Sequence, residues 1–232
     1  MNKKLAGIIG IILSILFLVY FNDIFYKLLI VLNIDINSYS ILTKSIIDLI
    51  IKLCMCFIIY LIYKKDFKHS RKSNNIFKSI LFMLIYLIVL ILGVYLFGYI
   101  INYLGNLFNV SIINNVYYNI FNKKIDIYLI IKIINDYVLI PFIYSSLVIL
   151  SVDKLCRRND IFILLCGLLG GICYALTLHG TFIYTLLNSL NTFIIYCVLA
   201  MAYRKNNSIY FSIILYGLYL VSYGVILNYL GW

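Results

Sequence analysis

Seven apolar stretches, each about as long as a membrane is thick, constrain this chain more than any other feature of its sequence. A transmembrane helix needs roughly 20 mostly apolar residues to cross a hydrocarbon core about 30 Å thick. Lipid offers no hydrogen bonds, so such a stretch satisfies its backbone N–H and C=O groups only as a helix. We therefore predict an all-α fold, a polytopic transmembrane helix bundle with spans near residues 5–22, 45–63, 79–101, 126–150, 161–178, 182–203 and 208–230.

The composition supports a lipid environment. Hydrophobic residues make up 65% of the chain, whereas soluble domains use roughly 45–50% apolar residues. A transmembrane β-barrel would need short segments of alternating polarity, and the run 80–91 shows no such alternation. We expect residues 1–232 to form a single integral membrane domain, in which residues 1–78 hold two N-terminal spans and a basic inner loop.

The basic residues predict the orientation of the bundle, because Lys and Arg collect in cytoplasmic loops. With the N-terminus inside, 13 of the 19 Lys and Arg residues fall in inner segments and four in outer ones. The chain is therefore predicted to be N-in and C-out, as a multi-pass protein of a bacterial-type cytoplasmic membrane. The net charge of +11 is explained by these loops, so we expect the lipid bilayer as a partner and no nucleic acid.

Polar residues within the fourth span form the first candidate site, because an ionisable group in the membrane costs free energy unless it is paired or hydrated. Lys132 and Asp136 are four residues apart and so share a helix face. They either line a wet cavity as a proton or substrate site, or neutralise each other for helix packing. Pro141 follows, and its missing N–H predicts a kink beside this polar patch.

Three other features are interpreted as structural. Five of the six cysteines lie inside spans without Cys/His metal-ligand spacing, so they are taken as packing residues, and we expect no metal or other cofactor. The 23 tyrosines are attributed to a compositional bias and to helix ends at the headgroup level. Gly167 and Gly171 form a Gly-x-x-x-Gly ridge that predicts close approach of another helix.

A proline before a polar patch, a later helix that ends near a histidine, and a last helix after a short polar turn follow one another between residues 110 and 230. Pro141 leads into Tyr144 and Ser145, His179 follows about 34 residues later, and Tyr216 stands in the last helix. This order resembles the CPBP family, the CAAX-protease and bacteriocin-processing membrane proteins, whose core would cover residues 110–230. In that family a glutamate pair stands where this chain has Tyr144 and Ser145, and a histidine stands at the position of Tyr216.

The resemblance implies a metalloprotease scheme in which a glutamate activates a metal-bound water held by histidines and an Asn or Asp. His179 fits its motif with Ala175 at the family's Phe position, whereas Tyr174 at that position would place Leu178 at the histidine. The chain contains no glutamate and a single histidine near the bundle. We therefore interpret it as a degenerate member, a pseudoenzyme that lacks the glutamate pair and the second histidine.

We predict a binding function without hydrolysis. The expected ligand is a membrane segment, a lipidated or hydrophobic peptide, or a partner membrane protein. The alternative is a membrane transport component with an intramembrane polar substrate path, and the third choice is an active intramembrane metalloprotease. The polar side chains expected to line the binding cavity are Lys132, Asp136, Ser145, His179, Asn188 and Asn191.

Overall fold

The computed structural model describes residues 3–20, 27, 40–69, 76–112 and 126–230, and within these ranges the regular structure is helical throughout. The helices are α1 (Lys3–Ile15), η1 (Leu16–Tyr20), α3 (Ile41–His69), α4 (Ile76–Leu107), α5 (Ile127–Ile134), η3 (Asn135–Leu139), α6 (Ile140–Leu155), α7 (Asn159–Ala175), α8 (Phe182–Asn206) and α9 (Ile209–Leu230).

Each of the seven apolar stretches corresponds to one of these helical rods, and the all-α fold class is confirmed for the described residues. The fourth rod consists of α5, η3 and α6 end to end. Four rods are long and apolar enough to cross a membrane: α3, α4, the α5–α6 rod and α8. The apolar parts of the other three, α1 with η1, α7 and α9, are shorter.

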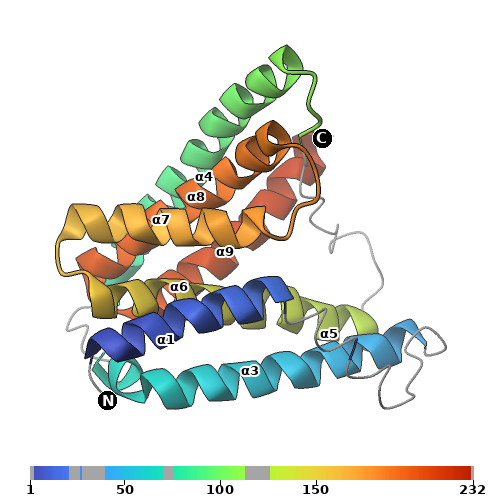
Figure 1. Ribbon diagram of the computed structural model, residues 1–232. Helices are drawn as coiled ribbons and strands as arrows, with labels where there is room; N and C mark the ends of the chain where they lie inside the picture. Colours follow the sequence, from blue (N-terminus) through green and yellow to red (C-terminus); the bar gives the residue numbers. More distant parts are fainter. Residues whose placement is uncertain (1–2, 21–26, 28–39, 70–75, 113–125, 231–232) are drawn as a thin grey trace.

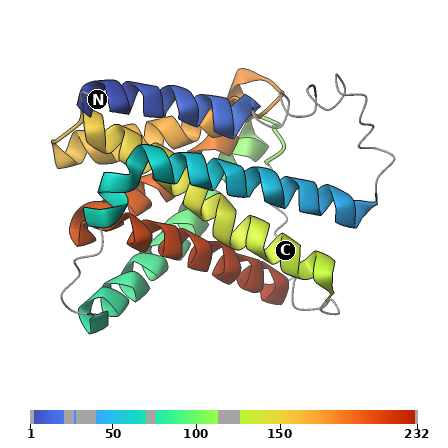
Figure 2. The same ribbon diagram turned by 90° about the horizontal axis from the view of Figure 1, so that it is seen from below.

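Helix α6 lies at the centre of the bundle. It packs against α1, α3, α7, α8 and α9, and its residues Leu147 to Leu150 are completely buried. Figure 1 shows α1, α3 and α6 running side by side, with α4, α8 and α9 inclined across them. Seen from below, α9 runs beside α5 and α6 on the side away from α1 (Figure 2). Side chains of five helices therefore meet around α6.

Charged side chains join the helices at one end of the bundle, which we call the basic end. Lys154 at the end of α6 forms an ion pair with Asp66 at the end of α3. Arg204 at the end of α8 lies 3.0 Å from Asp153 and 4.0 Å from the ring of Phe162 in α7. These contacts bring together the C-terminal ends of α3, α6 and α8 and the start of α7. Such a meeting is expected when the basic loops that connect the helices lie on one side of the bundle.

The helix is irregular just before Pro141. Residues Asn135–Leu139 form a π-helical turn, in which the Ile140 N–H donates to the carbonyl of Asn135. Helix α9 comes close to this turn, because a Cβ added at Gly217 would lie 2.8 Å from the Tyr137 carbonyl oxygen. A kink was predicted at Pro141, and the feature that the structure shows is a π-turn that ends two residues before it. Such turns inside helices often occur at functional sites.

Candidate functional site

A pocket of about 390 Å³ lies between α6, α7, α8 and α9, with η1 and η3 closing its sides. This volume falls within the usual range of small-molecule sites, about 300–1,000 Å³. Tyrosines dominate its polar surface, and Asp136 is the one charged side chain among the described residues that line it. The five lining tyrosines come from four rods of the bundle: Tyr137, Tyr144, Tyr174, Tyr196 and Tyr216.

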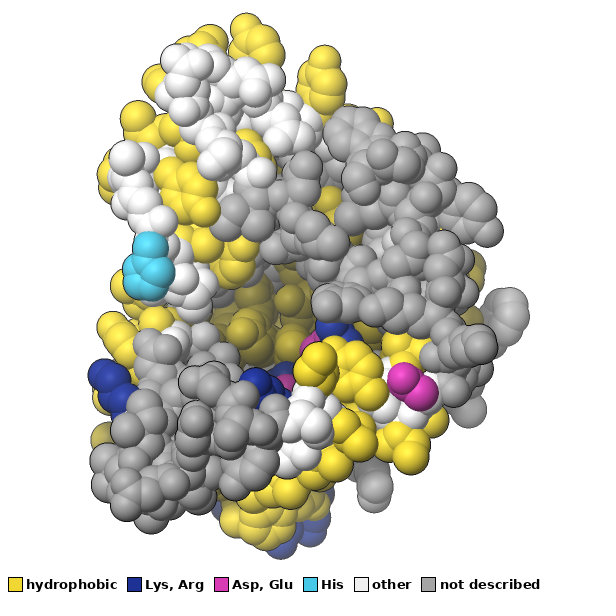
Figure 3. Space-filling view, turned by 90° about the vertical axis from the view of Figure 1, so that its right-hand side faces the viewer, with side chains coloured by type: hydrophobic (Ala, Val, Ile, Leu, Met, Phe, Trp, Pro, Cys, Tyr) yellow, Lys and Arg dark blue, Asp and Glu magenta, His cyan; other side chains and the backbone are white. Residues whose placement is uncertain are grey.

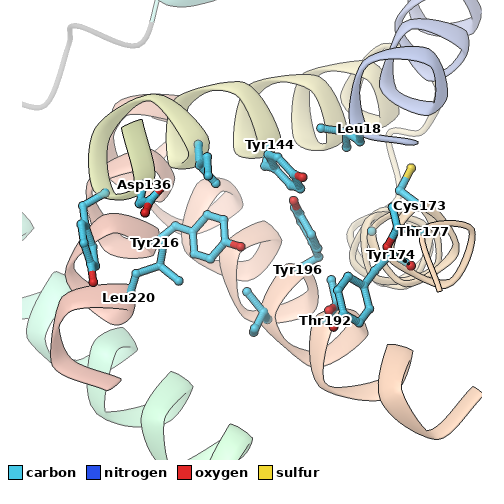
Figure 4. A pocket seen from close by; sticks show the side chains of 14 residues that line it. Leu18, Asp136, Tyr144, Cys173, Tyr174, Thr177, Thr192, Tyr196, Tyr216 and Leu220 are labelled. Carbon is cyan, nitrogen blue, oxygen red and sulfur yellow. Dashed lines mark hydrogen bonds between the residues drawn. The ribbon is translucent and has the colours of Figure 1, made fainter. Parts of the chain in front are cut away.

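Three of these tyrosines meet in the middle of the pocket (Figure 4). Tyr144 comes from α6, Tyr196 from α8 and Tyr216 from α9, and the Tyr144 and Tyr196 hydroxyl groups point toward each other. The rings of Tyr196 and Tyr216 are tilted at 60° with centroids 6.2 Å apart. Tyr196 is only 1% exposed, and its hydroxyl has no hydrogen-bond partner among the described residues. A buried unpaired hydroxyl costs about 1–3 kcal/mol, so it favours a bound partner.

A glycine in α7 makes room for the Tyr196 ring. A Cβ added at Gly170 would lie 2.0 Å from Tyr196 Cδ2, and one added at Gly167 would lie 2.5 Å from Cys197 Sγ. Ordinary carbon–carbon contacts are about 3.5–4.0 Å. The close approach expected for the Gly167 ridge is therefore confirmed, with α8 as the neighbouring helix, and it places Tyr196 against the pocket wall.

Asp136 connects the pocket to charged side chains of α3. Its carboxylate interacts electrostatically with Lys52, Lys132 and Asp48. Lys52 Nζ lies 2.7 Å from the Asp48 carboxylate, and Asn135 Nδ2 donates to the same carboxylate over 3.1 Å. Helix α3 and the α5–α6 rod thus bring two ammonium and two carboxylate groups near one another. These opposite charges compensate each other, which lipid would not do for a single charge.

Figure 3 faces the end of the bundle at which α3 and α5 begin. The molecule is hollowed there, with hydrophobic side chains at the bottom of the hollow and both basic and acidic side chains at its margin.

Of the expected lining residues, Asp136 lies on the pocket surface, together with Tyr144 and Tyr216 from the degenerate motif positions. Lys132 interacts with Asp136 but is not among the lining residues. The π-turn begins between these two residues, so the simple four-residue helix spacing does not hold there.

The remaining expected lining residues lie elsewhere. Ser145 is completely buried, with its hydroxyl unpaired among the described residues, and His179 is exposed just after α7. Asn188 Nδ2 donates to the Tyr184 carbonyl over 2.8 Å, which holds it against its own helix. Asn191 is partly buried. None of these four lines the pocket, so the structure does not bring them to one site with Asp136.

Sequence reasoning did not identify most of the tyrosines in the pocket. Tyr137 and Tyr144 are seven residues apart, and Tyr216 is followed by Tyr219 and Tyr223, so aromatic side chains recur along one face of each helix. Tyrosine is so frequent in this chain that these spacings did not stand out.

The charges of α3 were also missed, although they carried a signal. Asp48 and Lys52 repeat the four-residue spacing of Lys132 and Asp136. Two such pairs within membrane spans are a stronger signal than one, because each isolated charge would be unfavourable in lipid.

Within the described parts of the chain, no three His, Cys, Asp or Glu side chains gather as metal ligands. The pocket instead offers phenolic hydroxyls, aromatic rings and one carboxylate. At neutral pH such groups hydrogen-bond and stack on a ligand, since phenols ionise only near pH 10. No family model matches the chain, and neither a curated protein nor a solved structure matches it significantly.

Proposed function

We propose that the protein crosses a bacterial cytoplasmic membrane seven times, with its N-terminus inside and its C-terminus outside. At 1.5 Å per residue the three shorter rods, α1 with η1, α7 and α9, are about 26–33 Å long, close to the hydrocarbon thickness. Their packing against the long rods supports the same crossing. The ion pairs at the basic end support a cytoplasmic position for it, since basic residues favour that side.

Within the membrane, the protein binds a hydrophobic ligand in the tyrosine pocket. The ligand class is a membrane segment, a lipidated peptide or a partner membrane protein that inserts a side chain or an acyl group. The observation that carries this proposal is the pocket itself, about 390 Å³ in volume and lined by apolar and phenolic groups, with the unpaired hydroxyl of Tyr196 at its centre. A buried hydroxyl without a hydrogen-bond partner favours a ligand that completes its hydrogen bond.

Binding without hydrolysis is the better account of the chemistry at this pocket. The chain resembles the CPBP family in the order of its pieces, and two of the positions that would carry catalysis there are Tyr144 and Tyr216, which line the pocket. A neutral phenol is a poor base for water activation. His179 lies exposed after α7, outside the pocket lining. These placements support a degenerate, non-hydrolytic member of that family.

A transport component is the second candidate. The observation that favours it is the charged group of Asp48, Lys52, Lys132 and Asp136, which adjoins the pocket through Asp136. Intramembrane charge pairs mark substrate or proton paths in many transporters. Transport predicts that substrate accumulation in vesicles depends on Asp136, whereas binding alone predicts occupancy without accumulation.

Site-specific photocrosslinking in native membranes tests the binding proposal. A photoreactive phenylalanine analogue replaces Tyr216 inside the pocket, and the matched control carries the same analogue at Tyr95, which is 56% exposed on α4. A Thr192→Trp substitution fills the pocket from α8. The proposal predicts a discrete adduct at position 216 that Thr192→Trp removes. The proposal is refuted if the adduct at position 216 is equally strong with and without Thr192→Trp. It is also refuted if an adduct forms at position 95 and none forms at position 216.

A further inference from the structure

We propose that the ligand of the tyrosine pocket carries a protonated amine, bound by Asp136, and an apolar remainder that continues past Tyr196. This inference rests on the proposed binding function and names the chemistry of its ligand. The amine is a primary, secondary or tertiary ammonium, because it has to donate a hydrogen bond.

Asp136 brings a carboxyl group to the pocket surface. It lines the pocket from the π-turn Asn135–Leu139. Lys52 and Lys132 act on it electrostatically from α3 and α5, but neither lines the pocket. Lys52 also forms an ion pair with Asp48, at 2.7 Å. The pocket therefore offers a carboxyl group that none of its other lining side chains matches in charge, and an ammonium group of a ligand is a suitable hydrogen-bond donor to it.

Tyrosine rings form the pocket wall beside this carboxylate. Figure 4 places Asp136 at one end of the pocket and the Tyr216 ring between it and Tyr196. Tyr137 belongs to the same turn as Asp136 and also lines the pocket. Ammonium groups are attracted to the faces of aromatic rings within about 6 Å, and this attraction is strongest where water is excluded. A carboxylate together with tyrosine rings is thus suited to an organic amine rather than to an anion.

The pocket continues past Tyr216 to the buried Tyr196. Tyr196 is 1% exposed and its hydroxyl has no partner among the described residues, yet it lies in the middle of the pocket (Figure 4). The pocket wall also carries the apolar side chains of Leu18, Ile195 and Leu220. A ligand that fits both ends has an amine near Asp136, a hydrocarbon portion along these side chains, and a polar atom within reach of the Tyr196 hydroxyl.

Calorimetric titration of the purified full-length protein in detergent micelles tests the inference. The probe is hexylamine, which is protonated at pH 7, and the comparison ligand is hexan-1-ol, which has the same chain without the charge. The inference predicts that the wild-type protein binds hexylamine at least tenfold more tightly than hexan-1-ol, as expected for one hydrogen bond to a charged group. Equal affinity for the two ligands would overturn it, and this comparison needs no variant to fold.

Two substitutions assign the contacts. Asp136→Asn is expected to abolish the preference for hexylamine, and Tyr196→Phe to weaken hexylamine binding about three- to tenfold. The matched controls are Asp160→Asn and Tyr99→Phe, which change exposed residues of α7 and α4 outside the pocket and are expected to leave the affinity unchanged. A folded Asp136→Asn variant that keeps the tenfold preference would overturn the inference.

The amine has two natural sources, a lysine side chain or N-terminal amine of the peptide or membrane segment proposed above, and the headgroup of an aminophospholipid. Repeating the titration in nanodiscs of phosphatidylglycerol, with and without phosphatidylethanolamine, separates them. Competition by phosphatidylethanolamine supports a lipid headgroup, and an unchanged affinity supports an amine carried by a peptide or protein. If hexylamine shows no preference while the adduct at position 216 persists and is removed by Thr192→Trp, the amine inference fails and the proposed binding function stands.

Discussion

The substitution Gly170→Ala tests whether the contact between α7 and α8 positions Tyr196. The added Cβ would lie 2.0 Å from Tyr196 Cδ2 and 2.5 Å from its Cγ, whereas carbon atoms in contact are about 3.5–4.0 Å apart. The ring therefore has to retreat by about 1.5–2 Å, or the two helices have to separate. Because Tyr196 is almost completely buried, the ring can move mainly into the pocket.

The expected change in the free energy of unfolding follows from comparing alanine substitutions at two glycines. Overpacking a closely packed interior costs about 1–3 kcal/mol, and replacing a helical glycine by alanine returns up to about 1 kcal/mol through helix propensity. Gly98, in the middle of α4, provides the control, since a Cβ added there has no atom within 4 Å. The propensity gain is common to both variants, so Gly170→Ala is expected to be about 1–3 kcal/mol less stable than Gly98→Ala.

The assay is reversible unfolding in mixed micelles, followed by circular dichroism as the fraction of denaturing detergent rises. Capture of ligand at position 216 is measured in the same preparations, and we expect Gly170→Ala to reduce it at least severalfold while Gly98→Ala leaves it unchanged. If the two alanine variants have the same free energy of unfolding within about 0.5 kcal/mol, the packing account of the pocket wall is refuted.

Three further predictions concern the rest of the bundle. Arg204→Ala removes an ion pair, a hydrogen bond and a contact with an aromatic ring, so the free energy of unfolding should fall by about 2–4 kcal/mol. The control Arg157→Ala, at an exposed residue, should lower it by no more than about 0.5 kcal/mol. Equal losses in the two variants would contradict the reasoning. Tyr63→Phe deletes a buried 2.8 Å hydrogen bond to α6 and should cost about 1 kcal/mol more than Tyr99→Phe, and a smaller difference would count against it. In a cysteine-free background, an impermeant thiol reagent should label His179→Cys in intact cells and Arg157→Cys only after permeabilisation; the reverse pattern would exclude the N-in orientation.

Hydropathy alone predicted the helical rods because each rod is specified locally. A stretch such as 182–203 is apolar enough to be helical in lipid whatever its neighbours are, and α8 indeed spans Phe182–Asn206. The π-turn Asn135–Leu139 lies just before Pro141, where the sequence predicted a kink. These predictions required no knowledge of which helices touch.

The pocket could not be predicted in the same way, because it depends on how the helices are rotated and how closely they approach. Tyr196 reaches the pocket through the space left at Gly170 on another helix. The π-turn breaks the regular spacing from Lys132 to Asp136, so a helical wheel does not tell which of the two faces inward. His179 was expected at the site from its place in the motif order, but α7 ends at Ala175, before this residue.

The central claim is that this helical bundle holds a ligand in the tyrosine pocket without cleaving it. Native mass spectrometry of the protein released from mild detergent tests this most directly, with the wild-type protein compared with Thr192→Trp. The account predicts a one-to-one complex for the wild type, loss of that mass in the variant, and recovery of the ligand chemically intact. A ligand mass that is the same in both proteins, or recovery of a cleaved product whose formation a chelator prevents, would contradict it.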